Sequence, residues 1–597
     1  MRIAVLVKQV PAIGEMALGA DGRLVRDGIE LEMSAYCRRA VSKAAELASE
    51  RAGTSVTVLT LGPPTAEDAL REAIAWGLDR DVDISGVLVS DPAFAGSDTL
   101  ATARAVAEAL NHLGPFDLIL CGKNSVDADT GQVPPQVAEL LDLPFATAVK
   151  TLELAGDNLT LGCELDDQWI DCEIALPALI SCAERLCDPS KVPPPGRALV
   201  PAERIRHLDA ATLGPGPWGQ AGSPTWVGAT KALPVDRLRR VEPDAPLIDQ
   251  VRTAVQVIIQ RGGLDSSAPP PTTAVPQSPA GSAGVVAVIA EADRAELLRE
   301  LLAEATRLAT EIGGSTAVLT NDDAIDARTL GSYGADHIVH LVGAAVEEDI
   351  AGAVAEWALE NQPWAILAGS TAAGREVASR VAARLGAGLT GDAVELDVED
   401  GRLVAWKPAF GGQLVAAVHT SSPIQLATVR SGVLPTPEPR EIQDDVEISV
   451  ERREVIPRGR VVVVNRHRDD DIDILADASV VISVGQGVDP ADYPALQPLV
   501  DLLGAELGCT RKVTDQGWMT HARQIGITGR TVAPRLFVMI GASGKFNHTV
   551  GIRAARSVLA INSDPDVPAW DHADAGIVAD WRDVIPLLVA ELTAAGA

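Results

Sequence analysis

The strongest constraint on this fold is an internal repeat. Four short segments of the first half recur in the same order further along the chain, at offsets of roughly 244 to 260 residues. The pairs are Ser55–Thr60 with Ser315–Thr320, Trp76–Arg80 with Tyr333–His337, Phe116–Gly122 with Pro363–Gly369, and Val137–Leu141 with Val381–Leu385. Four ordered matches indicate two tandem copies of one domain, which we expect to pack on one another as a pseudo-dimer.

Each copy alternates apolar strands with amphipathic helices. Strands are predicted in the first copy at residues 3–7, 56–61, 87–89 and 118–121, with helices at 40–50, 66–75 and 101–110. These strands are too continuously apolar for a half-exposed antiparallel sheet, so we predict parallel sheets covered by helices. A hairpin-like, strand-rich piece ends each copy, at 148–183 and 393–429. The fold class is therefore α/β, with two homologous Rossmann-like domains.

Two polar, proline-bearing stretches divide the chain. Residues 265–284 contain five prolines and no hydrophobic periodicity, which predicts a semi-extended linker. Residues 430–460 are a second connection and a candidate hinge, and a third α/β domain begins after them. We therefore expect domains at 1–264, 285–455 and 456–597, separated by the linker at 265–284.

The third domain carries a nucleotide-like signature at residues 524–580. An apolar run, Arg535–Ile540, leads into Gly541-Ala-Ser-Gly544, a helical segment and a second strand, Val558–Asn562. Strand, glycine turn, helix, strand and acid is the order that holds a dinucleotide on an open parallel sheet. The glycines admit a phosphate, and the helix N-terminus points free N–H groups at it. This domain has no counterpart in the first half, so the site is single.

Composition excludes several classes of protein. The 597 residues carry a net charge of −32, which argues against nucleic-acid binding. No run approaches the roughly 18–20 apolar residues that span a bilayer, and the N-terminus lacks a signal peptide, so a cytoplasmic protein is expected. The seven cysteines form no C-x-x-C pair, which predicts reduced core thiols and no metal site.

These motifs resemble the electron transfer flavoproteins, whose alpha and beta chains here follow one another in one polypeptide. The beta-like part is 1–264 and the alpha-like part 285–597. The matching motifs are VLVKQVP at 5–11, DADTGQV at 127–133, TAAGRE at 371–376, PIQLATVR at 423–430, QIGITG at 524–529, GASGKFNH at 541–548, AINSD at 560–564 and ADAGIVAD at 573–580. The resemblance implies an adenine nucleotide alpha hydrolase-like fold for each copy and a doubly wound FAD-binding domain at the C-terminus.

The resemblance also implies which residues hold FAD. Arg511 would lie by the isoalloxazine ring and favour the reduced, anionic flavin, and His548 would donate toward its N1/C2=O edge. Thr528 would lie near N5, while Ser543 would hold the pyrophosphate and Asn562 and Asp580 the ribose and adenine. The full set is Arg511, Gln524, Gly526, Thr528, Gly529, Ser543, Gly544, Asn547, His548, Asn562 and Asp580. Asp564 either joins the ribose end or caps a turn.

This sequence departs from the family pattern at a few positions. Ile527 and Asn547 each stand where the family usually has glutamine, and Gln486 replaces an arginine between two glycines. These changes put the flavin potential and affinity in question. In the beta-like part Ser34-Ala35 replaces an Asn-Pro pair, so contacts to a bound nucleotide are altered there.

The beta-like part has its own nucleotide and partner sites by resemblance. AMP, or a second FAD in its place, would be bound by Cys37, Asp127, Asp129, Thr130, Gly131 and Gln132. Helix capping is the alternative role for the loop at 127–132. A partner-docking loop falls within 188–208, with Leu199 as its candidate anchor.

The resulting expectation is a soluble electron carrier rather than a turnover enzyme. Its FAD would accept electrons from a flavoprotein dehydrogenase of the acyl-CoA type, as in fatty acid β-oxidation. It would pass them to a quinone oxidoreductase or similar acceptor. Two alternatives stay open: a two-FAD bifurcating protein that oxidises NADH, and a degenerate nucleotide-binding scaffold without a redox role.

Overall fold

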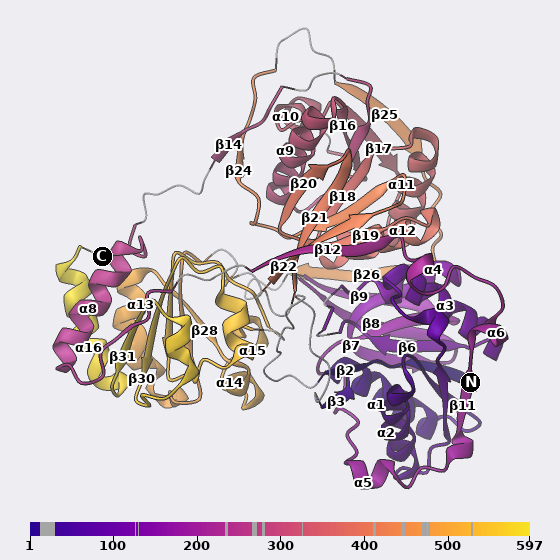
Figure 1. Ribbon diagram of the computed structural model, residues 1–597, viewed down its shortest axis with the longest axis horizontal. Coiled ribbons are helices and arrows are strands. Elements are labelled where there is room, and N and C mark those ends of the chain that lie inside the picture. Colours follow the sequence, from indigo (N-terminus) through magenta and orange to yellow (C-terminus); the bar gives the residue numbers. More distant parts are fainter. Residues whose placement is uncertain are drawn as a thin grey trace. The chain divides into compact units, whose positions relative to one another are not determined.

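The computed structural model of the chain contains two compact units. Unit 1 comprises residues 1–231, 270–410 and 415–467, and unit 2 comprises 232–269, 411–414 and 468–597. The residues described are 1–11, 30–125, 127–128, 130–166, 168–232, 237–265, 272–277, 281–324, 326–409, 414–442, 448–468, 474–475, 478–526 and 529–596. Each unit has its own parallel sheet with helices packed against it (Figure 1).

The first copy in unit 1 is built on a ten-stranded sheet. Its order is β11-β5-β4-β1-β6-β10-β7-β8-β9-β26, and the first seven strands run parallel. The strands of this copy are β1 (Arg2–Leu6), β4 (Ser55–Leu61), β5 (Ile84–Val89), β6 (Leu118–Gly122), β7 (Phe145–Ala155), β8 (Asn158–Leu165), β9 (Gln168–Ala175), β10 (Ala178–Cys182) and β11 (Ile205–Leu208). Helices α1 (Ala35–Glu50), α2 (Glu67–Leu78), α3 (Thr99–Leu113) and α4 (Val133–Leu140) cover the sheet, because each presents an apolar stripe to it.

The second copy repeats this arrangement strand for strand. Its sheet has the order β19-β23-β18-β15-β16-β17-β25, which is the order of the first copy from β7 to β11. The strands are β15 (Val285–Ile289), β16 (Ser315–Thr320), β17 (His337–Val342), β18 (Ala365–Gly369), β19 (Leu389–Ala393), β23 (Gln425–Val429) and β25 (Ser449–Glu454). The helices are α9 (Ala295–Ile312), α10 (Ala327–Ser332), α11 (Glu347–Asn361) and α12 (Ala372–Leu385). The predicted duplication and α/β class are confirmed.

The two copies exchange a strand in each direction. β12 (Thr225–Ala232), from the first half of the chain, pairs with β22 (Leu414–Thr420) beside β21 (Arg402–Ala409) and β20 (Glu395–Glu399). In return, β26 (Val461–Arg468), from the second half, pairs with β9 at the edge of the first sheet. Separating the copies therefore breaks backbone hydrogen bonds in both sheets, in addition to side-chain contacts.

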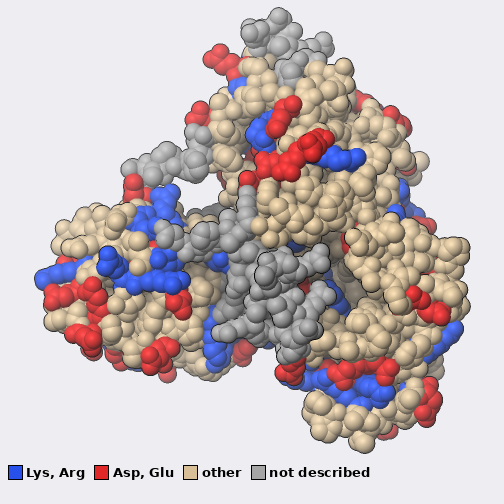
Figure 2. Space-filling model, viewed as in Figure 1, with Lys and Arg blue, Asp and Glu red and all other residues tan. Residues whose placement is uncertain are grey.

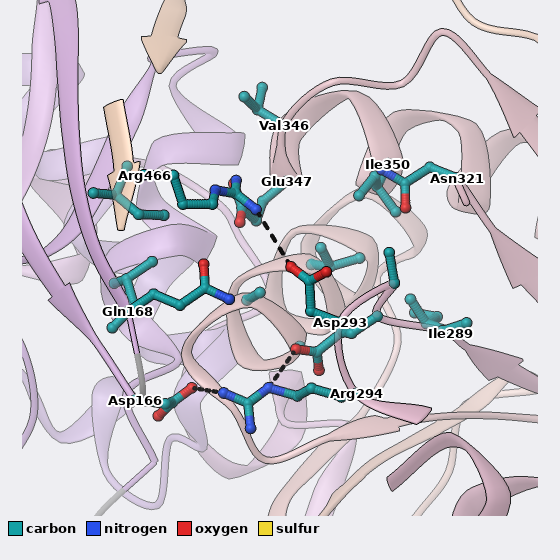
Figure 3. A pocket seen from close by; sticks show the side chains of 18 of the residues that line it. Asp166, Gln168, Ile289, Asp293, Arg294, Asn321, Val346, Glu347, Ile350 and Arg466 are labelled. Carbon is teal, nitrogen blue, oxygen red and sulfur yellow. Dashed lines mark ion pairs between the residues drawn. The ribbon is translucent and has the colours of Figure 1, made fainter. Parts of the chain in front are cut away.

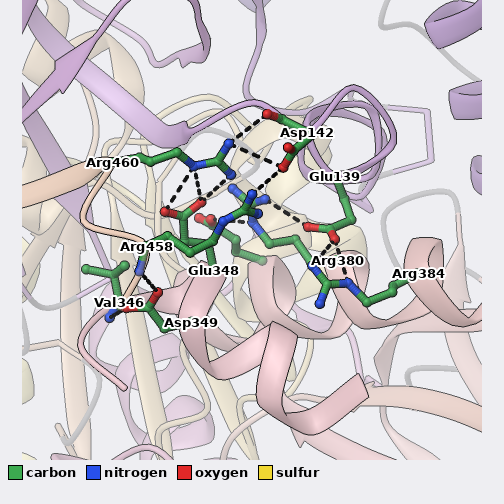
Figure 4. Close-up of polar contacts among 10 residues, drawn as sticks. Glu139, Asp142, Val346, Glu348, Asp349, Arg380, Arg384, Arg458 and Arg460 are labelled. Carbon is green, nitrogen blue, oxygen red and sulfur yellow. Dashed lines mark hydrogen bonds and ion pairs between the residues drawn. The ribbon is translucent and has the colours of Figure 1, made fainter. Parts of the chain in front are cut away.

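Buried and half-buried ion pairs join the copies within unit 1 (Figure 4). Arg380 is 1% exposed and contacts Glu139 at 3.2 Å and Glu376 at 3.0 Å, while Arg384 holds the other oxygen of Glu139 at 2.7 Å. Nearby, Arg460 contacts Asp142 of the first copy at 3.3 Å and Glu348 of the second at 2.8 Å. A buried charge without its partner is strongly destabilising, so this network favours one register between the copies.

Unit 2 is a six-stranded sheet completed by a segment from the first half of the chain. Its order is β13-β31-β30-β29-β27-β28, all parallel. The strands are β13 (Arg240–Val241), β27 (Val480–Val484), β28 (Glu506–Cys509), β29 (Leu536–Ile540), β30 (Ser557–Asn562) and β31 (Ala575–Val578). The helices include α8 (Leu247–Gln260), α13 (Gln497–Leu503), α14 (Arg511–Asp515) and α16 (Trp581–Ala594).

We call residues 237–265 the arm, because they follow the first copy in sequence but pack into unit 2. Val251 and Ile258 of α8 are 0% and 1% exposed, within the core that also contains Leu588 of α16. The arm explains why the compact units do not follow the predicted domains one for one. Residues 232–269 precede the linker in sequence yet lie in unit 2.

Part of the proline-rich linker is docked on the second copy. β14 (Thr272–Ala274) pairs in parallel with β24 (Thr436–Glu438), and Val275 is 5% exposed. The Pro276 carbonyl accepts a hydrogen bond from Arg440 Nη1 at 3.0 Å. The described part of the predicted semi-extended linker is therefore extended at 272–274, but it is paired with a strand of the second copy.

The predicted hinge at residues 430–460 is likewise wrong. β24 and β25 lie inside that range and pair with strands of unit 1, and the chain leaves unit 1 only after His467. All seven cysteines are free in the structure, with Cys187 half-buried and the others buried. Acidic and basic side chains are interspersed on the face in view (Figure 2), and no described helix is long and apolar enough to cross a membrane.

Candidate functional site

The carboxyl ends of the strands in unit 2 bring the predicted site together. β27 pairs with β29 so that Val484 lies opposite Ile540, and Ile540 in turn lies opposite Ile561 of β30. Gly485, Gly541 and Asn562 therefore follow at one edge of the sheet. The chain order reverses between β28 and β29 on either side of β27, and such a switch point is where open parallel sheets bind ligands.

Glycines let two turns approach closely at this edge. A Cβ atom on Gly485 would lie 2.2 Å from the carbonyl oxygen of Gly541, and Gly541 has φ +61°. Gly544 has φ +68°, and its Cβ would lie 2.3 Å from the Cα of Ala569. Both contacts are with backbone, which cannot rotate aside. The turn at 541–544 therefore needs glycine at both ends.

The helix expected after this turn is short. α15 spans Phe546–Thr549, four residues, and a single 3₁₀ turn at Val550–Ile552 follows it. A helix this short has little macrodipole. The helix after the turn is therefore shorter than expected, and its contribution to holding a phosphate stays a prediction.

His548 is buried at this edge, with both ring nitrogens engaged. Its Nδ1 lies 3.0 Å from the Ile525 carbonyl and its Nε2 lies 3.3 Å from Ser483 Oγ. A carbonyl only accepts, so Nδ1 carries the proton and Nε2 accepts from the serine hydroxyl. Burial lowers the pKa of His548 to about 4, so the imidazole is neutral near pH 7. Ser483 was not anticipated, because a serine inside an apolar strand gives no sequence signal.

The segment before β29 is anchored by Gln524. This side chain is 2% exposed, and its Oε1 accepts a hydrogen bond from Thr514 Oγ1 at 2.6 Å. A Cβ on Gly529 would lie 2.3 Å from the Gln524 carbonyl, and Gly526 has φ +130°. These residues shape the backbone beside His548. Thr528 and Ile527 lie outside the described residues, as does the side chain of Asn547.

Three predicted polar residues have internal partners. Asn562 donates through Nδ2 to the Ala542 carbonyl at 2.9 Å and accepts from the Asp564 N–H at 3.0 Å, so it braces the glycine turn. Asp564 accepts in turn from the Asp566 N–H at 2.9 Å. Asp580 caps α16 by accepting from the Arg582 N–H at 2.9 Å.

Three other predicted residues are exposed. Ser543 and Gln486 both face solvent, and so does Arg511, which pairs with Asp515 of its own helix at 3.4 Å. Exposed polar groups beside a glycine turn are free to meet a ligand. No FAD contact of any predicted residue is tested by the structure, so these roles stay predictions.

The beta-like part forms a second polar cluster, at the carboxyl ends of β1 and β6. Lys8 Nζ lies 2.8 Å from Asp127 and 3.1 Å from Ser125 Oγ. Burial alone would raise the pKa of Asp127, but the ammonium of Lys8 outweighs it and lowers that pKa. The Oδ1 of Asn124 accepts from the N–H of Gly131, whose φ is +63°. Lys8 was missed as a site residue, although a lysine directly after an apolar strand was a usable signal.

The other predicted residues of this cluster differ in their surroundings. Cys37 is buried, which raises the pKa of its thiol. Gln132 is 2% exposed, accepts from Thr99 Oγ1 at 2.6 Å and donates to the Leu389 carbonyl of the second copy at 3.4 Å. Gln132 thus joins the two copies. Thr130 is partly exposed beside it, and Asp129 lies outside the described residues.

Comparisons with known proteins identify the family of this chain. The description "Electron transfer flavoprotein domain" matches residues 21–209 and 286–455, the two copies. "Electron transfer flavoprotein FAD-binding domain" matches residues 474–553, in unit 2. The chain belongs to the electron transfer flavoprotein family.

Relatives of both subunit types of electron transfer flavoprotein are similar to parts of this chain. The alpha subunit of Thermoanaerobacterium thermosaccharolyticum is 36% identical over 309 residues, 49% of this chain and 92% of the relative. The beta subunit of the same organism is 34% identical over 265 residues, 44% of this chain and 97% of the relative. Lactate dehydrogenase (NAD(+),ferredoxin) subunit LctC of Acetobacterium woodii is 33% identical over 305 residues, 49% of this chain and 72% of the relative. The chain is thus a fused electron transfer flavoprotein.

The second copy has a cavity of about 130 Å³ at the position equivalent to the Lys8 cluster (Figure 3). Val7 and Ala290 make the same backbone hydrogen bond to the neighbouring strand, so Glu291 is the counterpart of Lys8. Glu291 accepts from Thr371 Oγ1 at 2.6 Å, and burial raises its pKa to about 7.

A carboxylate of the first copy already occupies the N-terminus of α12 at this cavity. Asp166, from the first copy, accepts from the Ala372 N–H at the start of α12 at 2.6 Å. The duplicated sites of this electron transfer flavoprotein therefore differ. One presents the ammonium of Lys8, and the other presents carboxylates that are paired with Arg294 and Arg466.

Proposed function

We propose that this protein is an electron carrier that holds one redox-active FAD in unit 2. The observation that carries the proposal is the single glycine-lined switch point at the carboxyl ends of β27, β29 and β30, inside the stretch matched by the family's FAD-binding domain. Arg511, Ser543 and the turn at 541–544 are the groups we assign to the flavin and its pyrophosphate. Gln524, Asn562 and His548 hold the surrounding backbone.

We further propose that AMP occupies the beta-like cluster. Lys8 supplies the cation that a phosphate requires, and the loop at 123–132 follows the carboxyl end of β6 at the switch point of that sheet. The ammonium is held by Asp127 and Ser125, so it is positioned before a ligand arrives. The counterpart cluster in the second copy, with Glu291 in place of Lys8, is not assigned a phosphate ligand.

The donor we propose is a flavoprotein dehydrogenase of the acyl-CoA type, and the acceptor a quinone oxidoreductase or similar protein. Leu199 supports a docking role, because its side chain is 81% exposed on the loop expected to meet the donor. A second candidate is flavin-based bifurcation with NADH. The similarity to LctC, whose name includes NAD(+) and ferredoxin, favours that candidate.

Counting the nucleotides released from the denatured protein tests these assignments. We expect one FAD and one AMP per chain, and bleaching of the flavin spectrum when an acyl-CoA dehydrogenase and its acyl-CoA are added. Two FAD per chain with reduction by NADH would instead establish the bifurcating candidate. A protein that remains colourless after incubation with FAD would contradict both and support the scaffold interpretation.

Replacing His548 with alanine tests the edge of the flavin site. The change leaves the Ile525 carbonyl and the Ser483 hydroxyl without their partner, which costs about 1–3 kcal/mol for each buried group. We expect lower FAD content and a shifted flavin midpoint potential, measured by spectroelectrochemistry. The matched control is Ser483→Ala, which keeps the imidazole and releases only Nε2. Unchanged FAD content and potential in His548→Ala would remove His548 from the site.

A further inference from the structure

The loop that presents Leu199 is held rigidly from beneath. Helix α5 (Pro194–Arg197) precedes Leu199, and Val192 and Val200 on either side of it are 5% and 4% exposed. Ser190, at the start of the loop, is 0% exposed, and its N–H donates to the Arg38 carbonyl at 3.2 Å. Leu199 is thus an apolar side chain, 81% exposed, between two buried anchors.

Arg197 makes the central contacts that hold the loop around Leu199. The side chain is 11% exposed, and all three of its nitrogens are used. Nε donates to the Val192 carbonyl at 2.7 Å, Nη1 to Asp68 at 2.5 Å, and Nη2 lies 2.9 Å from Glu72. One planar guanidinium therefore ties the loop to helix α2 in a fixed geometry that an ammonium cannot reproduce.

Glu72 extends the network into the core of the first copy. It is 0% exposed and also accepts from Arg38 Nε at 2.9 Å, so its carboxylate bridges two arginines. On the far side of Leu199, Arg71 donates through Nη1 to the Val200 carbonyl at 2.9 Å. The backbone around Leu199 is therefore held on both sides by side chains of one helix, α2.

We propose that Arg197 is a positioning residue for partner docking, holding Leu199 in place to enter an apolar socket on the donor dehydrogenase. The inference rests on the proposed function. Immobilising a loop at the moment of binding weakens association, and a loop that is already ordered avoids that loss. The end of unit 1 that carries α5 is mostly uncharged in Figure 2, with acidic and basic side chains beside it, which suits an apolar contact with a polar rim.

The test uses the FAD-loaded, full-length protein with a medium-chain acyl-CoA dehydrogenase and its acyl-CoA as the donor system. For Arg197→Met we expect the KM for this protein as electron acceptor to rise about 5- to 20-fold, while kcat and reduction by dithionite stay unchanged. Amide hydrogen exchange at residues 198–201 should speed up by about tenfold or more, because the contacts of Arg197 that hold the loop are lost. For Arg197→Lys we expect a KM and an amide exchange rate between those of Arg197→Met and wild type.

Two further variants separate the effect of holding the loop from the effect of the Leu199 side chain itself. Leu199→Ala should raise the KM without changing hydrogen exchange in the loop. Arg51→Met is the matched control: it removes the same charge outside the docking loop, from a half-exposed pair with Asp157 at 3.6 Å, and should change neither quantity. Should Arg197→Met fail to fold, Asp68→Asn, at the 44% exposed edge of the network, should give smaller shifts of the same sign.

The outcomes distinguish the two proposals. If dithionite reduces the wild-type protein but the dehydrogenase does not reduce it, the proposed donor is contradicted. The docking role is then contradicted as well. A wild-type protein reduced by the dehydrogenase, with KM or loop exchange unchanged in Arg197→Met and in Asp68→Asn, would overturn the positioning role alone.

Discussion

Replacing Asp574 with asparagine is expected to lower the free energy of unfolding of unit 2 by about 3–5 kcal/mol. Asp574 is 0% exposed and lies 3.0 Å from Arg237 and 3.1 Å from Arg261, both in or beside the arm. Its Oδ2 also accepts from the Val558 N–H at 2.8 Å. Asparagine keeps the volume but leaves Arg237, whose side chain is 3% exposed, as a buried charge without a counterion.

Denaturant unfolding followed by flavin fluorescence measures this effect. The arm should also become a site of limited proteolysis, because Asp574 joins it to the sheet. The control is Asp571→Asn, three residues away: Asp571 is 71% exposed and its pair with Arg239 spans 3.8 Å, so we expect a change within about 0.5 kcal/mol. Equal losses in the two variants would contradict the importance of burial.

Replacing Gly544 with alanine is expected to lower stability by about 2–5 kcal/mol and to weaken FAD binding at least about tenfold. An alanine at φ +68° is strained, and its Cβ would lie 2.3 Å from the Cα and 2.4 Å from the N of Ala569. Those atoms are backbone, so the 541–544 turn must move. That movement displaces the N–H groups that we assign to the pyrophosphate.

The FAD dissociation constant of the refilled, deflavinated protein measures this displacement. Gly504→Ala is the matched control, because Gly504 has φ +56° but no atom within 4 Å of its Cβ position. It should show only the strain of the left-handed conformation, about 1–2 kcal/mol, with unchanged FAD affinity. If Gly544→Ala bound FAD as tightly as Gly504→Ala does, the turn would not be part of the cofactor site.

Sequence reasoning succeeded where the pattern was local or repeated. The strand–turn–strand order at 535–562 predicted β29, the glycine turn and β30, because apolar runs bounded by glycine depend on neighbouring residues only. It failed for the helix after the turn and for the linker. An amphipathic stretch does not reveal that α15 ends after four residues. The proline content of the linker likewise does not reveal that Val275 is buried.

The candidate site shows the same division. The residue types at Gly544 and His548 were identifiable, but their partners were not. In the fold the two ring nitrogens of His548 contact Ile525 and Ser483, and its role toward a flavin stays a prediction. These partners lie 23 and 65 residues from His548 in the sequence. Tertiary packing brings them together, and no local pattern encodes that packing.

The sequence by itself determined the duplication, the α/β class and the presence of one unpaired C-terminal domain. It could do so because hydrophobic periodicity and ordered repeats are properties of the chain alone. Only the tertiary structure decided that β12 and β26 are exchanged and that the arm completes unit 2. It also decided that Lys8 and Glu291, a basic and an acidic residue, occupy equivalent positions in the two copies. These outcomes depend on contacts between residues hundreds of positions apart, where burial and charge pairing, rather than local propensity, determine the structure.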